Sequence, residues 1–519
     1  MKCYTNVEVS AILTEGFTYG FKLNYDGPRF GFECDNLKSI NKRENEAISI
    51  AMKEVRLGRL AGPFLFKPFE NLLVSPVGLI PKKDGTWRLI HHLSFPPGHS
   101  VNDHIDNIHC TVKYTSFDEA LEMITKVGTG AVIARLDIKS AFRLIPIHPN
   151  DFSLLGYKIA KYYFVDKCLP FGCAISCALF EKFANFLEWE LKRRANSDSV
   201  VHYLDDFLIA GSDFDKCVTF MNCYRSLCTD LGVPLAEEKT LGPATRINFL
   251  GLEIDTLEMM VRIPGDKLDK LRQQLGKMLG CKKTTLLDLQ SLTGLLNFCS
   301  RAIPSARAFI RRFYDAMQGM TNPHHHVRVS SEMKEDIKML LFFLDNFNGT
   351  YLFNELKWVG SDDLELYTDS AGGIELGCAA IFGTHWVFFK WPSKWKNCPI
   401  MRDITFSELV PIFLAFLIWS NEFKYKRIVL HTDNKGLIPI LNRKTSKSKR
   451  VMGLVRPLVL CSMLWGIYFK AKHIEGKSNI FADALSRQQM SRFRMSLPNA
   501  DVLPAPIPES FLQTLSRIE

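Results

Sequence analysis

Two short apolar segments of the chain carry aspartates whose positions suit metal-dependent chemistry. Asp137 follows the apolar run that begins at Val132, and the adjacent pair Asp205 and Asp206 interrupts the run at 200–210. A tight hairpin at this pair would bring both carboxylates to one end of a sheet, where like charges in an apolar frame repel unless a cation neutralises them. Two divalent ions about 3.5–4 Å apart would do so, and would hold the attacking and leaving oxygens of a phosphoryl transfer. The alternative is a solvated turn, in which Asp-Asp pairs are common; the apolar flanks favour the metal site.

A second set of acids lies in the C-terminal half of the chain. Asp369 and Asp433 end two predicted strands, Glu408 lies early on a predicted helix, and Asp483 lies on a later one. Isolated acids at strand ends are often helix caps or solvated turns, so only the order of the whole set can carry a functional interpretation.

The composition bounds the classes of protein and partner. The chain has 519 residues, 47% hydrophobic and 23% charged, which is typical of a folded globular protein and excludes wholesale disorder. The net charge of +10 fits an anionic partner. The excess is concentrated in residues 261–328, with 12 Lys and Arg against 4 Asp and Glu, and in the tract 443–450, with five basic residues and no acid. These two segments are candidates for binding a phosphate backbone.

The cysteines and apolar runs indicate the compartment. The 14 cysteines include no CxxC pair, so we interpret them as reduced residues of an intracellular protein, in the cytoplasm or nucleus. The longest apolar runs, 409–419 and 458–469, are shorter than the ~18–20 residues that cross a bilayer. We therefore expect no membrane partner.

The sequence around the first acids resembles reverse transcriptases. Tyr203-Leu-Asp205-Asp206 is similar to their YxDD box, and the string LDIKSAF, which contains Asp137, is similar to their motif A. Four further motifs occur in the family's order: the fingers hairpin at 75–88, motif B at 169–180, motif D at 232–239 and the primer-grip turn at 249–251. Six motifs in order form a specific signal.

This resemblance implies a role for each matching residue. Asp137, Asp205 and Asp206 would hold two Mg²⁺ ions, with Mn²⁺ as an alternative. Lys239 would protonate the departing pyrophosphate, and Phe142 would exclude the ribose 2′-hydroxyl as a steric gate. The simpler interpretations are an exposed lysine for Lys239, a core phenylalanine for Phe142 and a solvated basic turn for the triphosphate-binding residues named next. The remaining substrate-binding residues would be Lys82, Lys83 and Arg88, which contact the incoming triphosphate, and Gly172 of motif B.

The second set of acids resembles the Asp-Glu-Asp-Asp quartet of RNase H domains. The local strings YTDS, SEL, HTDN and IFADALSR carry Asp369, Glu408, Asp433 and Asp483. The family's fold would bring these acids to one edge of a sheet, with two Mg²⁺ ions that activate water for hydrolysis of the RNA strand of an RNA–DNA hybrid. His473, ten residues before Asp483, matches the family's mobile histidine; a hydrogen-bonded structural histidine is the alternative. The tract 443–450 is a substrate handle, a nuclear-localisation signal or a solvated loop.

Together these resemblances predict an α+β right-hand polymerase followed by an α/β RNase H-like domain with a mixed five-stranded sheet. The predicted segments are an N-terminal extension at 1–60, fingers and palm at 61–255, a helical thumb at 256–328, a connector at 329–362, the RNase H-like domain at 363–487, and a proline-rich tail or linker at 488–519.

The expected function is copying of retrotransposon RNA into cDNA, with hydrolysis of the RNA strand. The expected partners are an RNA template, a DNA primer, the RNA–DNA hybrid and deoxynucleoside triphosphates. The string from His91 to Asp103 is most similar to DIRS-type retrotransposons, which implies a separate tyrosine recombinase of the same element; a gypsy-type or pararetroviral polyprotein is the second lineage. Two other classes are a catalytically silent, retroelement-derived nucleic-acid-binding protein and a DNA-templated polymerase with a proofreading domain. The presence of all seven acids favours an active enzyme.

Overall fold

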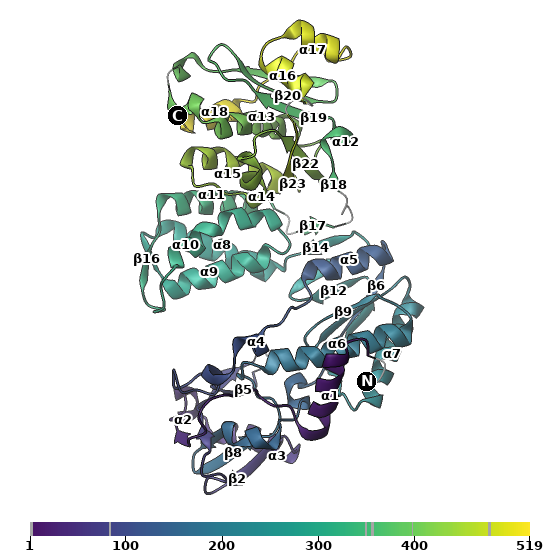
Figure 1. Ribbon diagram of the computed structural model, residues 1–519, viewed down its shortest axis with the longest axis vertical. Coiled ribbons are helices and arrows are strands. Elements are labelled where there is room, and N and C mark those ends of the chain that lie inside the picture. The colour runs from purple at the N-terminus through teal and green to yellow at the C-terminus, as the bar shows by residue number, and fades with distance from the viewer. Residues whose placement is uncertain are drawn as a thin grey trace. The chain divides into compact units, whose positions relative to one another are not determined.

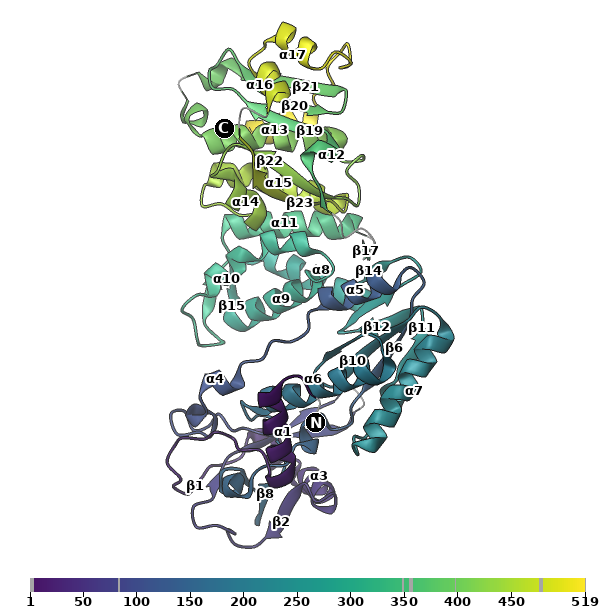
Figure 2. The ribbon, with the colours of Figure 1, turned by 45° about the vertical axis from the view of Figure 1, so that its right-hand side comes forward.

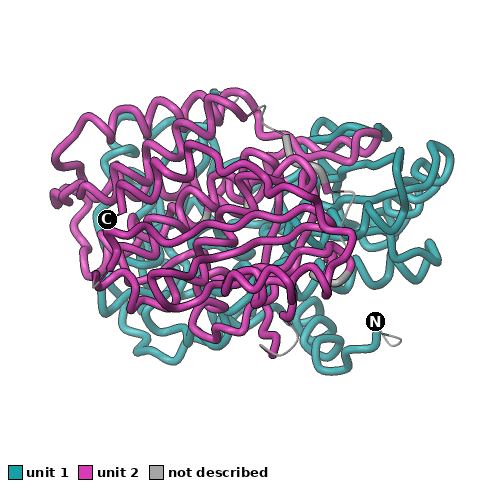
Figure 3. Tube along the Cα trace, turned by 90° about the horizontal axis from the view of Figure 1, so that it is seen from above, with its two compact units in different colours: residues 1–249 teal, residues 250–519 magenta. Residues whose placement is uncertain are grey.

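The chain divides into two compact units. The computed structural model describes residues 4–82, 85–347, 350–353, 358–396, 398–475 and 479–518. Unit 1 comprises residues 1–249 and unit 2 comprises residues 250–519 (Figure 1, Figure 3). Among the described residues, no helix combines the length and the apolar character needed to span a membrane.

The centre of unit 1 is a four-stranded antiparallel sheet, which we call the palm sheet. Its strand order is β11-β6-β10-β9. Helices α5 (Phe117–Val127), α6 (Ser176–Ala195) and α7 (Phe214–Asp230) pack against it (Figure 2). The strands are β6 (Val132–Asp137), β9 (Val200–Tyr203), β10 (Asp206–Gly211) and β11 (Leu241–Ala244).

Local sequence explains why these elements form. Phe207, Leu208 and Ile209 of β10 are fully buried, as expected for a central strand that is covered on both faces. Helix α5 begins with a capping box, in which Ser116 and Glu119 bond each other's backbone N–H groups. Burial of β10 therefore fixes the sheet that carries the first acids.

A second sheet of unit 1 includes the N-terminal segment. Its strand order is β1-β3-β7-β8-β2, and a separate hairpin joins β4 (Val77–Pro81) to β5 (Trp87–His91). Residues 1–60, predicted as an extension, supply helices α1 (Val7–Tyr19), α2 (Lys38–Asn41) and α3 (Glu44–Arg56), and they bury Leu13, Ala47 and Ala51 completely. The sheet strands are β1 (Phe32–Glu33), β2 (Leu60–Phe64), β3 (Leu73–Val74), β7 (Gly156–Ile159) and β8 (Tyr162–Asp166).

Unit 2 begins with a mainly helical region. Leu268, Leu271 and Leu275 recur at helical spacing and are buried on one face of α8 (Gly265–Gly280). The other helices are α9 (Leu286–Cys299), α10 (Arg311–Met317) and α11 (Ser331–Asn346), the last in the predicted connector. The segment predicted as a helical thumb also contains short strands, because β15 (Lys283–Thr285) pairs with β16 (His326–Arg328) and β14 (Met260–Arg262) pairs with β13 (Leu252–Asp255) and β17 (Thr350–Leu352).

The predicted RNase H-like segment, together with β18 from the predicted connector, forms two three-stranded sheets where one five-stranded sheet was expected. The first is antiparallel, β19-β20-β21, and the second is parallel, β18-β22-β23. All five expected strands are present, and β19 contacts β22. The additional strand β18 pairs with the start of β22 and so occupies part of the edge at which the two halves would join. The strands are β18 (Trp358–Val359), β19 (Leu366–Ser370), β20 (Gly377–Phe382), β21 (His385–Lys390), β22 (Arg427–Thr432) and β23 (Tyr468–His473).

Helices cover these sheets, and the C-terminal tail belongs to the same fold. Helices α13 (Ile404–Trp419), α14 (Leu437–Arg443), α15 (Lys449–Leu464) and α16 (Ile480–Ser486) follow the strands. The prediction of a linker at 488–519 is wrong, because α17 (Met490–Ser496) and α18 (Glu509–Ile518) pack with Phe493 and Phe511 fully buried. The prolines signalled a linker, but the apolar residues of α18 recur at helical spacing and bury one face.

Candidate active sites

Asp137, Asp205 and Asp206 meet at one end of the palm sheet. Asp137 ends β6 and lies directly opposite Asp206, the first residue of β10. Asp205 lies in the turn from β9 to β10, after Leu204, whose φ of 54° is left-handed. The carbonyl of Asp205 accepts the backbone N–H of Ile138 at 3.0 Å. The hairpin predicted at this pair is present, and its turn is bonded to the residue that follows Asp137.

Two basic side chains hold these carboxylates. The Nζ of Lys239 lies 2.8 Å from Oδ1 of Asp137, and Nε of Arg135 donates to Oδ1 of Asp206 at 2.8 Å. Lys239 is brought there because the backbone N–H of Ala236 donates to the carbonyl of Asp137 at 2.8 Å. Sequence reasoning found Lys239 and missed Arg135. The sequence feature that could have indicated Arg135 is a charged residue inside an otherwise apolar strand, two residues before Asp137 and therefore on the same face of the strand.

The electrostatics of this site reflect buried like charges. Burial, and then the charge of Asp137, raise the pKa of Asp205 to about 6. Burial also raises the pKa of Asp206, although Arg135 opposes this effect. Carboxylates that resist ionisation together gain most from an added cation.

Two of the predicted substrate residues, Phe142 and Arg88, lie against the aromatic ring of Phe171. Phe142 lies in the short 3₁₀ helix η2 (Ala141–Leu144), half-buried, with its ring centroid 5.5 Å from that of Phe171 and 5.8 Å from that of Phe180. The guanidinium carbon of Arg88 lies 4.9 Å from the centroid of the same Phe171 ring. The fingers hairpin, the predicted gate and motif B therefore meet at Phe171.

Gly172 is required by close packing. Its φ is 111°, and a Cβ atom there would lie 2.0 Å from the carbonyl oxygen of His91. The side-chain amide of Asn102, in the 3₁₀ helix Asn102–His104, donates to the Gly172 carbonyl at 2.8 Å and so joins motif B to this helix. Lys82 is exposed in the turn of the β4–β5 hairpin, and Lys83 lies outside the described residues.

Sequence reasoning also missed a buried polar network beside Phe142. Nη1 of Arg143 lies 2.7 Å from Oδ1 of Asp166, and Oδ2 of Asp166 lies 3.2 Å from Nδ1 of His91. The signal was an arginine within the apolar string AFRLIPI, but its partners are distant in sequence.

The second set of acids also converges. Ser370 Oγ donates to Oε1 of Glu408 at 2.9 Å, which joins α13 to β19, the strand that contains Asp369. Ser486 Oγ, on α16, donates to Oδ2 of Asp369 at 2.6 Å. Two seryl hydroxyls, missed in the sequence, thus connect these acids. The final serines of the YTDS and IFADALS strings were visible, but their partners were not.

The other two acids lie beside this pair. Asp483 is three residues before Ser486 on α16, and it pairs with Arg487 at 2.7 Å and Arg492 at 3.0 Å. Asp433 is exposed and follows the last residue of β22. Its charge raises the pKa of both Asp369 and Glu408, which places it near them.

Burial and repulsion are stronger here than in the palm. Burial, and then Asp369, raise the pKa of Glu408 to about 8, against the effect of the Ser370 hydrogen bond. Burial raises the pKa of Asp369 to about 6, with Asp483 and Asp433 adding to it and Ser486 opposing. The buried carboxyl groups of this cluster therefore resist ionisation together and would gain from an added cation.

The predicted histidine and basic tract have different outcomes. His473 is exposed and lies opposite Thr432 in the β22–β23 ladder, and Thr432 is the residue before Asp433.

In the tract 443–450, three basic side chains contact other residues of the protein. Lys444 packs over Phe469 at 4.4 Å, Lys449 pairs with Glu332 at 2.8 Å, and Arg450 lies 3.9 Å from Asp403. Arg443, Lys447 and Lys449 are exposed, whereas Lys444 and Arg450 are half-buried, so the tract offers a smaller basic surface than its sequence suggests.

Both sets of acids offer the oxygen donors that Mg²⁺ and Mn²⁺ prefer. Within the described ranges, no three His, Cys, Asp or Glu side chains are arranged so that they would share one metal ion. In the palm, Lys239 bonds Asp137 and Arg135 bonds Asp206. The donor chemistry fits divalent ions, and the contacts of Lys239 and Arg135 are made to Oδ1 of Asp137 and Oδ1 of Asp206.

A comparison with protein families covers the segment that contains the first set of acids. Residues 80–254 match the family described as Reverse transcriptase (RNA-dependent DNA polymerase). This segment is a reverse transcriptase domain. It contains the whole palm sheet and the acids Asp137, Asp205 and Asp206, whereas the cluster around Asp369 lies outside it.

Relatives of the reverse transcriptase domain are parts of viral polyproteins. The Gag-Pro-Pol polyprotein of Mason-Pfizer monkey virus is 27% identical over 267 residues, which cover 50% of this chain and 14% of that protein. The genome polyprotein of Petunia vein clearing virus (isolate Shepherd) is 23% identical over 375 residues, covering 71% of this chain and 16% of that protein. The chain thus spans less than a fifth of the length of these relatives.

Solved structures with some similarity come from foamy virus. The foamy viral protease-reverse transcriptase dRH in complex with double-stranded DNA has a TM-score of 0.49 at 15% identity, covering 86% of this chain and 72% of that one. The foamy viral protease-reverse transcriptase in complex with an RNA/DNA hybrid has a TM-score of 0.48 at 12% identity, covering 94% and 84%.

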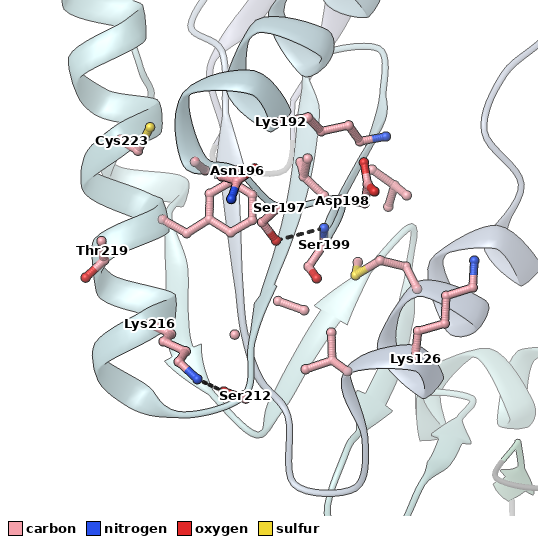
Figure 4. Close-up of a pocket in the computed structure, with 18 of the residues that line it drawn as sticks. Lys126, Lys192, Asn196, Ser197, Asp198, Ser199, Ser212, Lys216, Thr219 and Cys223 are labelled. Atoms are coloured by element: carbon pink, nitrogen blue, oxygen red, sulfur yellow. Dashed lines mark hydrogen bonds between the residues drawn. The ribbon is translucent and has the colours of Figure 1, made fainter.

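The reverse transcriptase domain also contains a cavity of about 950 Å³ that is separate from its acids (Figure 4). It is lined by the start of β9 and the end of β10, whereas Asp205 and Asp206 lie at the opposite ends of these strands. Lys192 at its wall pairs with Glu188 at 2.6 Å, and Lys216 donates to Ser212 at 3.0 Å. Its position excludes it from the candidate active site.

Proposed function

We propose that the protein is an RNA-directed DNA polymerase that also hydrolyses the RNA strand of an RNA–DNA hybrid. The observation that carries the polymerase is the β6–β10 pairing, which sets Asp137 opposite Asp206 with Asp205 in the adjoining turn, inside the segment that matches reverse transcriptases. The observation that carries the nuclease is the convergence of Asp369, Glu408 and Asp483 through Ser370 and Ser486.

The palm acids would hold divalent ions, Mg²⁺ or Mn²⁺, two for each site. When bound, such ions lower the pKa of a primer 3′-hydroxyl and neutralise a triphosphate. The protein's own contribution begins with Lys239, whose ammonium lies 2.8 Å from Asp137 and can donate a proton to departing pyrophosphate. Arg135 holds Asp206 in place until the site is loaded.

The substrate side of the palm supports a deoxynucleoside triphosphate as substrate. Arg88 has a planar fork suited to phosphate and stacks on Phe171, so its position is fixed before substrate arrives. Phe142 packs on the same ring, where its bulk would collide with a ribose 2′-hydroxyl. Lys82 at the tip of the fingers hairpin would add positive charge for the triphosphate.

In the second site, Asp369, Glu408, Asp433 and Asp483 would hold the ions that activate water for hydrolysis. Ser370 and Ser486 orient the carboxylates of Glu408 and Asp369. His473 is exposed at the end of β23, where it can exchange protons with solvent. Arg443 and Lys447 would contact the phosphates of the hybrid.

The proposed partners are an RNA template, a DNA primer, their hybrid and deoxynucleoside triphosphates. The cysteine pattern favours an intracellular protein. The resemblance of the string from His91 to Asp103 favours a DIRS-type element, in which a separate tyrosine recombinase would complete the cycle.

Primer extension on an RNA template tests the polymerase. Purified chain with Mg²⁺ should extend a DNA primer, and Asp205→Asn should lower the rate by about a thousandfold, as for removal of a charge-stabilising group. Asp230→Asn is the matched control, because Asp230 is exposed and pairs with Arg194 away from the site. If the wild-type chain binds the hybrid and extends no primer, it is a nucleic-acid-binding protein and the proposal fails.

A further inference from the structure

A buried ion network lies directly behind the predicted steric gate. It consists of Glu54, Arg143, Asp166 and His91. Arg143 donates from Nε to Oε2 of Glu54 at 3.0 Å and from Nη1 to Oδ1 of Asp166 at 2.7 Å. The side chains of Arg143, Asp166 and His91 are 9%, 6% and 3% exposed, so these charges are withdrawn from water.

The network joins the segments that bear the substrate residues. Arg143 is adjacent to Phe142 in η2, and its guanidinium also donates to the carbonyl of Cys168 at 3.1 Å, at the entry to motif B. His91 ends β5, the strand that carries Arg88, and its backbone N–H donates to the carbonyl of Phe171 at 3.1 Å. Asp166 therefore connects the gate, on one side, with the ring that the gate packs against, on the other.

Buried charges of this kind need a structural reason. Burial opposes ionisation of Asp166, yet Arg143 and His91 outweigh it and hold the pKa of that carboxyl below its usual range. Apolar residues of similar volume would often stabilise a core as well as buried ions do. Directional hydrogen bonds do provide what apolar packing lacks, which is a fixed orientation for each segment that they join.

We propose that Arg143, Asp166 and His91 are positioning residues that fix Phe142 against Phe171 and so set the discrimination against ribonucleotides. This inference rests on the proposed polymerase function and on Phe142 as the gate. A ring that excludes a single hydroxyl must be held within about 0.5 Å of its working position. Loosening the network lets the ring move away and admits the ribose.

The test compares incorporation of a ribonucleotide with that of the matching deoxynucleotide by the full chain, as a ratio of kcat/KM values. Phe142→Ala should raise the ribonucleotide share by about a hundredfold, and Asp166→Asn by about tenfold, within the range that one pocket contact provides. Glu54→Gln should raise it by about threefold, since Glu54 is 25% exposed and bonds only the outer side of Arg143.

A matched control separates positioning from a general loss of stability. Asp151 is also a buried carboxylate, and it pairs with Arg29 at 2.6 Å. This ion pair includes none of the four network residues. Asp151→Asn should lower stability and leave the ratio unchanged.

Combining substitutions gives the decisive readout. In a Phe142→Ala background, Asp166→Asn should add nothing to the ratio, because no ring remains to be positioned. If Asp166→Asn does not fold, Glu54→Gln and its combination with Phe142→Ala decide in the same way.

Each contrary result has its own meaning. A wild-type chain that extends no primer defeats the proposed function, and this inference with it. An unchanged ratio in Phe142→Ala overturns the gate and therefore the inference. A changed ratio in Phe142→Ala, with unchanged ratios in Asp166→Asn and Glu54→Gln, overturns the inference alone.

Discussion

The palm and the C-terminal acid cluster use the same residue types, yet the protein neutralises them differently. In the palm, Lys239 and Arg135 each lie 2.8 Å from a carboxylate. In the second cluster, Asp369 and Glu408 receive hydrogen bonds from seryl hydroxyls, and only Asp483 pairs with arginines. The first site therefore carries its own counter-charges, and the second depends more on charge supplied from outside.

This difference suits the two proposed reactions. In the proposed polymerase, a basic side chain close to the acids can protonate pyrophosphate, so Lys239 has a chemical use beyond neutralisation. In the proposed nuclease, a neutral hydroxyl orients a carboxylate without competing with a cation for its charge. The predictions below test this contrast, beginning with the largest effect.

Removing a carboxylate should have the largest effect, and only at its own site. Asp369→Asn should lower hydrolysis of the RNA strand by about a thousandfold, because it removes charge at the centre of the cluster. Primer extension should change by less than about twofold. Steady-state rates on one hybrid substrate measure both, with Asp501→Asn, a half-buried acid that pairs with His385, as the control.

Removing the side chain that donates to the acids should slow the palm reaction more than the reaction at the second cluster. Lys239→Met should slow primer extension by about a hundredfold, as for loss of a general acid. Ser486→Ala should slow RNA hydrolysis by less than about tenfold, since a hydroxyl only orients Asp369. Lys126→Met, at the cavity wall, is the control for Lys239. Equal losses in the two site variants would remove the contrast between the sites.

Metal binding should stabilise the second cluster more than the palm. Saturating Mg²⁺ should raise amide protection in residues 404–419 by about 2–3 kcal/mol, as for a ligand at about a hundred times its Kd. Protection in residues 200–211 should rise less, because Arg135 and Lys239 already neutralise the palm acids. Hydrogen exchange with and without Mg²⁺ measures both segments, and Glu408→Gln should reduce the gain in the first.

The smallest effect concerns His202 in β9, the first strand of the palm hairpin. Nδ1 of His202 lies 2.5 Å from Oε2 of Glu188, and Nε2 lies 3.4 Å from Oε1 of Glu181. Burial opposes the charged ring, but Glu181 and Glu188 outweigh it and raise the pKa of His202 to about 9. Its ordinary value is about 6.5. The folded protein thus keeps a proton that the unfolded chain has lost above that pH.

The resulting stability is complete below about pH 6.5 and is lost as the pH rises through about 9. We expect protection of residues 200–211 to fall by about 2 kcal/mol over this range, after correction for intrinsic exchange. His202→Gln should flatten the profile. A wild-type profile that is already flat would show that His202 does not support the hairpin.

Sequence alone predicted most of the reverse transcriptase domain because its determinants are local. The apolar runs around Asp137 and Asp205 specified three strands and a turn, and the structure pairs these strands in one sheet. It did not predict Arg135 as the partner of Asp206, because that contact depends on the register of strands 71 residues apart. The same holds for Arg143 with Asp166.

The C-terminal part was harder to predict for physical reasons. The prolines near residue 500 indicated a linker, but burial of Phe511 against α13 and β21 outweighs that local signal. The single five-stranded sheet was expected from the resemblance. The pairing of Trp358 and Val359 with the start of β22, which changes that sheet, carries no signal in so short a segment.

The most direct test of two separate active sites uses one labelled RNA–DNA primer substrate with the wild-type chain, Asp205→Asn and Asp433→Asn. With Mg²⁺, the wild-type chain should extend the DNA and cut the RNA, Asp205→Asn should only cut, and Asp433→Asn should only extend. Loss of both activities in either variant, or neither activity in the wild-type chain, would contradict this account.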